Sequence, residues 1–166
     1  LIGALWTIAI TLGAAVVSFF GGIFLAIVAL YAPAFVRWPF RVFSFLFLGT
    51  PLLLQLFLIY FGLVQIGIDV PAFVAGVVGL GLHFAVYNSE LFQTSILAVD
   101  KGQTEAAFAL GMQPGRTMSL IILPQAMRVI FPPLISQYLN LTKNTSLAIA
   151  VGYMDATGTL GGITLN

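Results

Sequence analysis

The 166-residue sequence has no cysteine, one histidine and very few charged residues. Without cysteine, and with His83 as the only histidine, it excludes a zinc deaminase, a thiol enzyme and an iron–sulfur protein. Only 7% of the residues are charged, against roughly 25% in soluble domains. This shortage excludes a soluble globular domain and also a disordered chain. The net charge of +1 gives no drive toward nucleic acid.

The sequence instead has long uncharged runs, and its mean hydropathy is +1.10. Residues 1–36, 42–68 and 70–89 carry no charge. Each run can cross about 30 Å of hydrocarbon as a helix that rises about 1.5 Å per residue. We therefore predict an all-α membrane protein. The expected spans are 3–31, 42–66, 71–97 and 117–142, with a cytoplasmic segment at 98–116.

The positions of Lys and Arg predict the orientation of these spans. Arg37 and Arg41 lie in the first connection, which Pro33 and Pro39 punctuate. The second connection has no Lys or Arg, whereas the third has both. Because positive charge is retained on the cytoplasmic side, the first and third connections are expected inside and the N-terminus outside. The chain begins without methionine or a basic n-region, so we interpret the first span as a true span in a chain that lacks its natural start.

The fourth span is expected to be irregular. Pro124, Pro132 and Pro133 interrupt it, and proline breaks or kinks a helix. Non-helical backbone at membrane depth needs protein or water around it, so this stretch is expected to face partner helices. Residues 151–166 contain four glycines and several threonines around Asp155, which indicates a broken or external segment.

The segment between the third and fourth spans has the signals of a short helix with defined ends. Asp100 stands where a side chain caps the first free amides, and Gln103 stands where a capping box would reciprocate. Gly111 follows the helix-forming residues and can adopt the left-handed conformation that ends a helix. Alanines give the helix one small face that another surface can approach. It is attached to two spans, so force on it moves both.

This segment matches the EAA motif of ABC importer membrane subunits at all of its specified positions, which are Glu105-Ala106-Ala107, Gly111, Ile121 and Leu123-Pro124. The chain resembles a bacterial ABC importer permease of the polar amino-acid uptake family. Further similar stretches are Gly49-Thr50-Pro51-Leu52-Leu53 with Gln55-Leu56-Phe57, Asp100-Lys101-Gly102-Gln103, Leu123-Pro124-Gln125-Ala126 and Lys143-Asn144-Thr145-Ser146-Leu147.

The resemblance implies a type I ABC importer permease (MetI-like) core with the N-terminus outside. Four of the five family spans or span-like segments are present, and the fifth would begin after Asn166. It also implies several partners in the bacterial inner membrane. They are an ABC ATPase dimer, a second permease subunit in a homo- or heterodimer, a periplasmic or lipid-anchored solute-binding protein, surrounding lipid and an amino-acid substrate. The residues expected to couple to the ATPase are Gln103, Glu105, Ala106, Ala107 and Gly111.

The chain itself has no site for ATP. A phosphate-binding loop ends in Gly-Lys-Ser or Gly-Lys-Thr, but Lys101 follows Asp100 and Lys143 follows Thr142. We therefore expect no cofactor or metal in this chain, with ATP and Mg²⁺ bound by the partner ATPase. His83 has no cysteine near it and no acidic residue within six positions, so it is not expected to act as a catalytic base.

Polar residues in the spans are candidates for a translocation pathway, because such residues are costly in lipid and face a bundle interior or a wet cavity. His83, Tyr87 and Glu90 share one helical face. The pathway candidates are Asn88, Glu90, Gln55, Thr50, Gln137 and Asn140. The alternative is interhelical hydrogen bonding, worth about 0.6 kcal/mol per contact, which we favour for His83 and Tyr87. Gly76, Gly79 and Gly81 are expected to be close-packing sites.

The chain also departs from the family pattern. Leu48 and Gln93 stand where the family usually or often has arginine, and Asn144 stands where aspartate is commoner. These departures suggest one half of a heterodimer whose other half keeps the ionic groups. Three other interpretations remain open: a permease for another small solute, a secondary transporter or channel, and a structural subunit of a respiratory complex. The EAA spacing favours the importer, which would work by alternating access.

Overall fold

The computed structural model describes the backbone of residues 2–164 and the side chains of residues 5–148. This part of the chain is helical, joined by short turns. The α-helices are α1 (Ile2–Tyr31), α2 (Ala34–Gly49), α3 (Leu52–Phe57), α4 (Leu63–Gln65), α5 (Ala72–Leu97), α6 (Lys101–Ala109), α7 (Pro114–Thr117) and α8 (Leu123–Thr164). Two π-helical segments, η1 (Leu58–Gly62) and η2 (Met118–Ile122), connect α3 to α4 and α7 to α8.

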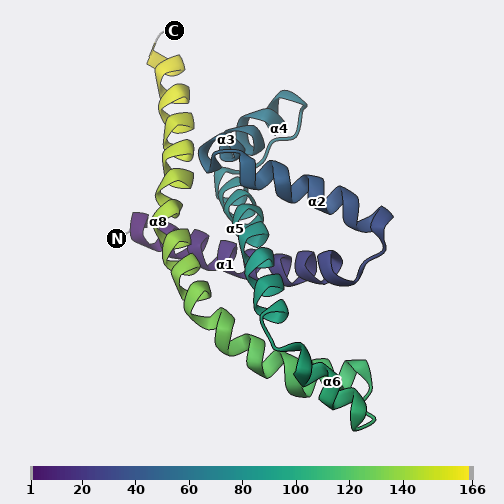
Figure 1. Ribbon diagram of the computed structural model, residues 1–166. Coiled ribbons are helices and arrows are strands. Elements are labelled where there is room, and N and C mark those ends of the chain that lie inside the picture. Colours follow the sequence, from purple (N-terminus) through teal and green to yellow (C-terminus); the bar gives the residue numbers. More distant parts are fainter. Residues whose placement is uncertain (1, 165–166) are drawn as a thin grey trace.

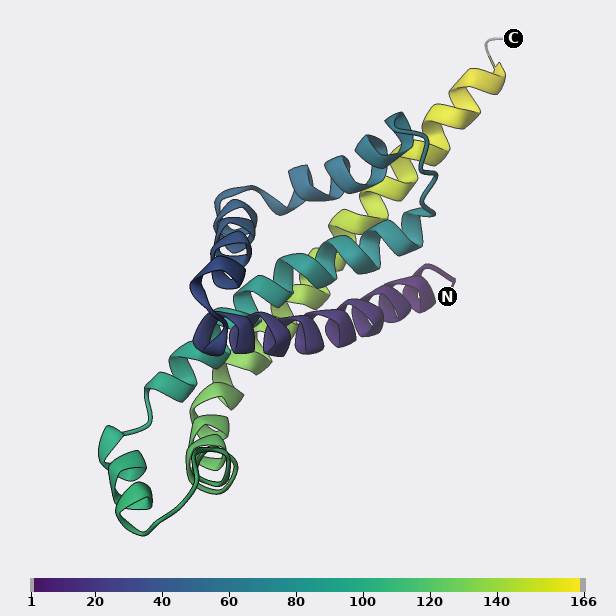
Figure 2. The same cartoon turned by 90° about the vertical axis from the view of Figure 1, so that its right-hand side faces the viewer.

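The long helices α1, α5 and α8 form the centre of the fold, and short helices lie at its two ends. Figures 1 and 2 show α6 at one end and α3 and α4 at the opposite end. Three segments are long and apolar enough to cross a membrane, at Leu5–Tyr31, Ala72–Leu97 and Pro114–Ala148. The segment that follows α5 and the segment that follows α4 are therefore separated by the length of α5.

Helices α1 and α5 form the most extensive contact, and small residues allow their close approach. The facing pairs are Gly13 with Val77, Val17 with Gly81, and Gly21 with Ala85. The members of every pair are 64 positions apart in the sequence, so the two helices run parallel in one register. Small residues at helix interfaces let backbones approach and give close van der Waals packing, which drives helix association in lipid.

The other glycines of α5 are also packing sites, as predicted. A Cβ atom added at Gly76 would lie 3.2 Å from Ala148 of α8, and one added at Gly79 would lie 2.6 Å from Leu56 of α3. Helix α8 is joined to α1 by a hydrogen bond of 2.9 Å between the hydroxyls of Thr11 and Thr145. The buried apolar core therefore collects side chains from α1, α3, α5 and α8.

The region predicted as one span at 42–66 lies in a bent pair of helices, which are long and apolar enough to cross a membrane only when taken together. The axis bends by 113° between α2 and the helical segment 52–65. Pro51 explains where the break falls, because the residue before a proline is driven out of the helical region, and Thr50 has ψ 143°. The predicted loop with Pro39 is also wrong, since Pro39 lies inside α2. Arg37 and Arg41 are therefore helical residues, one turn apart.

A buried glutamine holds the two sides of this bend together. Gln55 of α3 is 5% exposed, and its Nε2 donates to the backbone oxygens of Phe47, at 2.7 Å, and Thr50, at 3.1 Å. The same nitrogen lies 2.8 Å from the Thr50 hydroxyl. Its Oε1 lies 2.9 Å from Nδ1 of His83 on α5. Since Nε2 faces three oxygens, Oε1 must be the acceptor, so His83 carries its proton on Nδ1.

The prolines of the fourth span do not break it. Helix α8 continues through Pro132 and Pro133 to Thr164, and Figure 1 shows it as a long curved helix. Pro132 and Pro133 lack the backbone N–H that would donate four residues earlier, so the carbonyl groups of Arg128 and Val129 lose their donors. Such prolines are tolerated in a membrane helix when its neighbours support it, and α8 packs along α5. The predicted broken segment at 151–166 is helical through Thr164, whereas residues 165 and 166 lie outside the described residues.

The α1–α5 register predicts that a single methyl group at Gly81 destabilises the fold. An added Cβ atom would lie 2.5 Å from Cγ1 and 2.7 Å from Cβ of Val17, and overpacking of this kind costs about 1–3 kcal/mol. We expect Gly81→Ala to lower the thermal midpoint of the purified protein in detergent. The matched control is Gly62→Ala, because no atom lies within 4 Å of its added Cβ. Val17→Ala should rescue Gly81→Ala, and a variant pair with unchanged midpoints would contradict this packing.

The bend gives a second prediction, on Gln55. Gln55→Leu leaves two backbone carbonyls without their donor, at a cost of about 1–3 kcal/mol, and should let α2 and α3 move apart. Because the chain has no cysteine, spin labels at Phe45→Cys and Leu58→Cys report the distance across the bend without background. We expect a broader distribution of longer distances in Gln55→Leu. Gln65→Leu, at an exposed position, should leave the distribution unchanged; the same narrow distribution in both variants would show that Gln55 does not hold the bend.

Candidate functional site

The short helix α6, predicted from its capping signals, is closed at both ends. Oδ1 of Asp100 accepts a hydrogen bond of 2.6 Å from the backbone nitrogen of Gly102. At the other end Gly111 has φ +77°. Its backbone nitrogen donates to the oxygen of Phe108, at 2.9 Å, and that of Met112 donates to Ala107, at 3.0 Å. These two bonds form a Schellman motif, so the helix has a defined length of nine residues.

One side of α6 is fixed to the rest of the fold. Ala107 is 1% exposed. Gln103, predicted to complete a capping box, instead has its Oε1 3.3 Å from Nε2 of Gln125 on α8, and that nitrogen also donates to the oxygen of Ile121. The opposite side is free, since Glu105 and Ala106 are exposed. The predicted coupling residues therefore divide into two that anchor the helix, Gln103 and Ala107, and the exposed remainder.

The structure separates the predicted pathway residues into two groups. Thr50, Gln55 and Asn88 have internal hydrogen-bond partners, and the first two belong to the bend. Asn88 is fully buried, and its Nδ2 donates to the backbone oxygen of Ser18 at 3.2 Å. Its Oδ1 accepts no hydrogen bond in the part of the chain described. A Cβ atom at Gly22 would lie only 2.6 Å from Asn88 Cβ, so Asn88 is tightly enclosed between α1 and α5.

The second group is more open. Glu90 is exposed on α5, Gln137 is half-buried on α8, and Asn140 is exposed on α8. Glu90 does not share its surroundings with His83, the residue with which it was predicted to share a face. His83 lies at the bend, with its ring centroid 5.1 Å from that of Tyr87. Its hydrogen bond to Gln55 confirms the interhelical role that we favoured.

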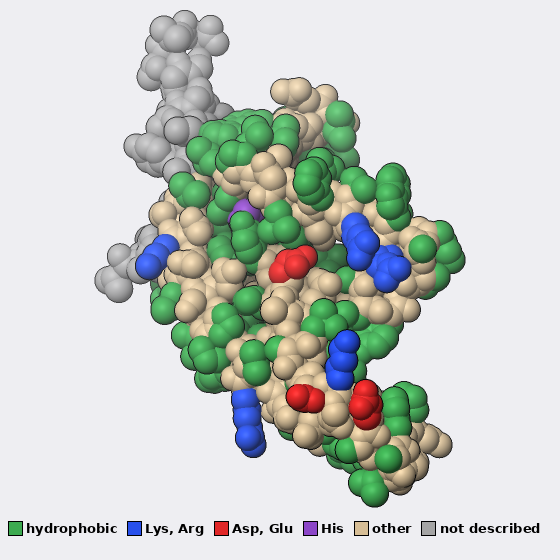
Figure 3. All heavy atoms as spheres, in the orientation of Figure 1, with side chains coloured by type: hydrophobic (Ala, Val, Ile, Leu, Met, Phe, Trp, Pro, Cys, Tyr) green, Lys and Arg blue, Asp and Glu red, His purple; other side chains and the backbone are tan. Residues whose placement is uncertain are grey.

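Glu90 lines a cavity of about 360 Å³ between α1, α2 and α5, which we name the charged cavity. Arg37 and Arg41 line it too, although sequence analysis treated them only as signs of orientation. Their spacing of four residues could have indicated a shared helical face, but only if the connection had been identified as a helix. Figure 3 shows acidic and basic side chains on the same face of the molecule.

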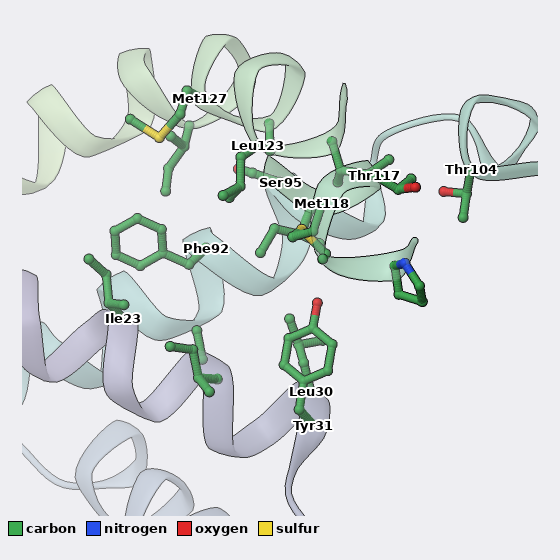
Figure 4. Close-up of a pocket in the computed structure, with 18 of the residues that line it drawn as sticks. Ile23, Leu30, Tyr31, Phe92, Ser95, Thr104, Thr117, Met118, Leu123 and Met127 are labelled. Carbon is green, nitrogen blue, oxygen red and sulfur yellow. The ribbon is translucent and has the colours of Figure 1, made fainter. Parts of the chain in front are cut away.

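A larger cavity of about 730 Å³, the apolar cavity, lies between α1, α5 and the segment from α7 into α8. Figure 4 shows Phe92 reaching between Ile23 on one side and Leu123 and Met127 on the other. Of its few polar residues, Thr117 is already committed, donating from its hydroxyl to the oxygen of Gln113 at 3.2 Å. The lining has no charged side chain, so the apolar cavity lacks partners for a zwitterion. Among the described residues no cluster of metal ligands forms.

Known proteins resemble the whole of this arrangement. The family of binding-protein-dependent transport system inner membrane components matches residues 18–165. The chain is 65% identical over 95 residues to the glutamate/glutamine/aspartate/asparagine transport system permease protein BztB of Rhodobacter capsulatus, covering 57% of this chain and 22% of that protein. It is 40% identical over 153 residues to the arginine transport system permease protein ArtQ of Bacillus subtilis, covering 89% of this chain and 70% of ArtQ.

Solved structures agree. A crystal structure of an amino acid ABC transporter with histidines superposes with a TM-score of 0.83 at 32% identity, over 98% of this chain and 77% of that one. The MetNI methionine ABC transporter in an inward-facing conformation has the same fold, with a TM-score of 0.72 at 20% identity, over 89% of this chain and 72% of that one. The chain spans well under two thirds of several curated relatives, 22% of BztB among them. It belongs to the family of binding-protein-dependent transport system inner membrane components and is a multi-pass membrane protein.

Proposed function

We propose that this chain is the membrane-spanning permease subunit of an ATP-driven importer, which takes amino acids from a solute-binding protein and moves them across the bacterial inner membrane. The observation that carries the proposal is the coupling helix, α6. It is capped at both ends and anchored on one side, yet its other side exposes Glu105 and Ala106. A rigid helix with one free small-residue face suits a docking site for another subunit.

The partner that fits this face is an ABC ATPase dimer, which would hold ATP and Mg²⁺. The exposed face of α6 continues into Leu110, the residue that caps the C-terminal end of the helix. This large apolar side chain is 83% exposed. Large apolar side chains in that position favour burial by a partner. The charge of Glu105 lies on the same face and supplies a polar contact at its rim.

The proposed mechanism is alternating access. ATP would bring two ATPases together, and each would pull one coupling helix. A second permease subunit, identical to this chain or different, would provide the other half of the pathway. Helix α6 is joined to α5 by three residues, and Gln103 joins it to α8, so movement of α6 reaches both helices. Glu90, Gln137 and Asn140 are the residues that we propose along the pathway, with Asn88, Gln55 and Thr50 supporting its walls.

The amino-acid substrate is supported by the relatives. Their names specify acidic amino acids and their amides, arginine and cystine, so the substrates of these proteins share the amino-acid backbone and differ in side chain. An importer for another small solute has no comparable support. A secondary transporter or a structural subunit would not need a docking helix such as α6.

We predict that Glu105→Lys weakens ATPase binding without destabilising the fold. Glu105 is exposed, and surface substitutions usually change stability by less than about 0.5 kcal/mol. The variant should keep its thermal midpoint while less ATPase co-purifies and ATP-driven uptake falls. Full co-purification and full uptake would show that α6 is not the docking site.

Gly111→Val tests the end of the same helix. A β-branched residue at φ +77° costs about 1–2 kcal/mol or more, so the last turn should rearrange and ATP-driven uptake should fall. The matched control is Gly115→Ala, in the neighbouring helix α7, where no atom lies within 4 Å of an added Cβ and φ is not positive. Equal uptake by the two variants would argue against the need for a defined helix end.

The substrate class is tested by transport. Proteoliposomes that contain the full complex with its binding protein should accumulate radiolabelled amino acids only when ATP is inside. A sugar and a short peptide serve as negative controls. Accumulation of these solutes without accumulation of any amino acid would refute the proposed substrate class.

A further inference from the structure

The charged cavity holds three of the few charged residues of the chain. Arg37 and Arg41 come from α2 and Glu90 comes from α5. Its volume of about 360 Å³ lies near the lower end of the range of roughly 300–1,000 Å³ for ligand pockets. The side chains that line the charged cavity therefore carry two positive charges and one negative charge.

These charged groups do not neutralise one another. Glu90 makes no ion pair within the residues whose side chains are described, and the same holds for Arg37 and Arg41. Glu90 lies within the candidate span Ala72–Leu97, where an unpaired charge is expensive and marks a water-filled cavity or a substrate pathway. The cavity therefore presents a carboxylate and two guanidinium groups that are free to bind a ligand.

Neighbouring residues keep the cavity open for such a ligand. Leu48 and Gln93 line it, and these are the two positions at which the chain has a neutral residue in place of the arginine of the family pattern. Gln93 donates from Nε2 to the backbone oxygen and the hydroxyl of Ser89, at 3.3 and 3.1 Å. The side-chain carbonyl oxygen of Gln93 is consequently still able to accept a hydrogen bond, beside Glu90.

We infer that the charged cavity binds an acidic amino acid, which has two carboxylates and one ammonium group; this inference rests on the proposed function, whose substrate it specifies. Each guanidinium takes one carboxylate in a charge-assisted contact. Glu90 and the carbonyl of Gln93 take the ammonium group. All three charges are then paired, which also removes the cost of leaving the half-buried Arg37 without a partner.

Other amino acids fit this set of charges less well. A neutral amino acid leaves one guanidinium without a carboxylate, and a basic one brings a second cation toward Arg37 and Arg41. Such like-charge contacts provide the repulsive half of specificity. A lipid phosphate would satisfy the arginines but would place an anion beside Glu90, so the zwitterionic headgroup of a substrate matches the cavity better.

The test is equilibrium binding to the purified complex, with its ATPase and permease partners, in nanodiscs of phosphatidylcholine. The probe is L-[³H]glutamate, competed by L-glutamine and by L-arginine. We expect glutamate to bind tightest. Arg37→Gln and Arg41→Gln should each weaken glutamate binding about tenfold or more, and one of them should abolish the preference over glutamine. Arg→Lys at the same position should restore most of the affinity.

Glu90→Gln should weaken glutamate and glutamine alike, because both have an α-ammonium group. The matched control is Arg128→Gln, an exposed residue of α8 that does not line the cavity and should bind glutamate normally. All variants are first checked for an intact complex by size-exclusion chromatography.

Three results would overturn the inference. They are equal affinity for glutamate, glutamine and arginine; arginine variants that bind glutamate normally; and loss of bound phosphatidylglycerol, rather than of glutamate, when the arginines are replaced in nanodiscs that contain this lipid. A complex that imports amino acids but shows any of these results would refute the inference alone. A complex that imports no amino acid would refute the proposed function.

Discussion

The parallel packing of α1 on α5 is the constraint on which the rest of this structure depends. Glycine and other small residues face larger ones at matching heights, so the register cannot slip without a clash. Lipid offers no hydrophobic drive for helix association, and van der Waals contact across small residues supplies it instead. Helix α5 also carries His83, Asn88 and Glu90, and it leads directly into α6. Its register with α1 therefore sets the position of the bend, of the charged cavity and of α6.

Satisfaction of backbone polar groups is the second constraint, and it explains why several polar residues are structural. A bend of 113° frees carbonyl groups at the end of α2, and in a membrane each must find a donor. The side-chain nitrogen of Gln55 supplies that donor, and its side-chain oxygen accepts a hydrogen bond from His83. Two pathway candidates, Gln55 and Thr50, are thereby committed to the fold. Polarity within a span indicates a need for a partner, and the partner can be the chain itself.

Local signals in the sequence were sufficient for some elements. Asp100 and Gly111 predicted both ends of α6, and the apolar runs predicted the long helices, because capping and hydropathy depend on nearby residues. Pro51 marks where the break falls, but the angle of 113° was not predictable, since it depends on the contact between Gln55 and Phe47 and on α5 behind them. The continuity of α8 through Pro132 and Pro133 was missed for a similar reason: packing against α5 outweighed local propensity.

The candidate site likewise combines residues that nearby sequence signals indicate with residues that only the fold brings together. The proposed coupling residues were selected by their spacing in the sequence, but the Gln103–Gln125 hydrogen bond, which joins one of them to α8, is visible only in the fold. The charged cavity combines residues from α2 and α5 that are about fifty positions apart, and no local pattern joins them. The sequence did show that charged residues are rare in the rest of the chain. In a chain with eleven charged residues, three line one cavity without pairing, and the substrate that we propose would pair all three. The proposed coupling helix α6 follows α5 after three residues, so α5 joins that helix to the charged cavity.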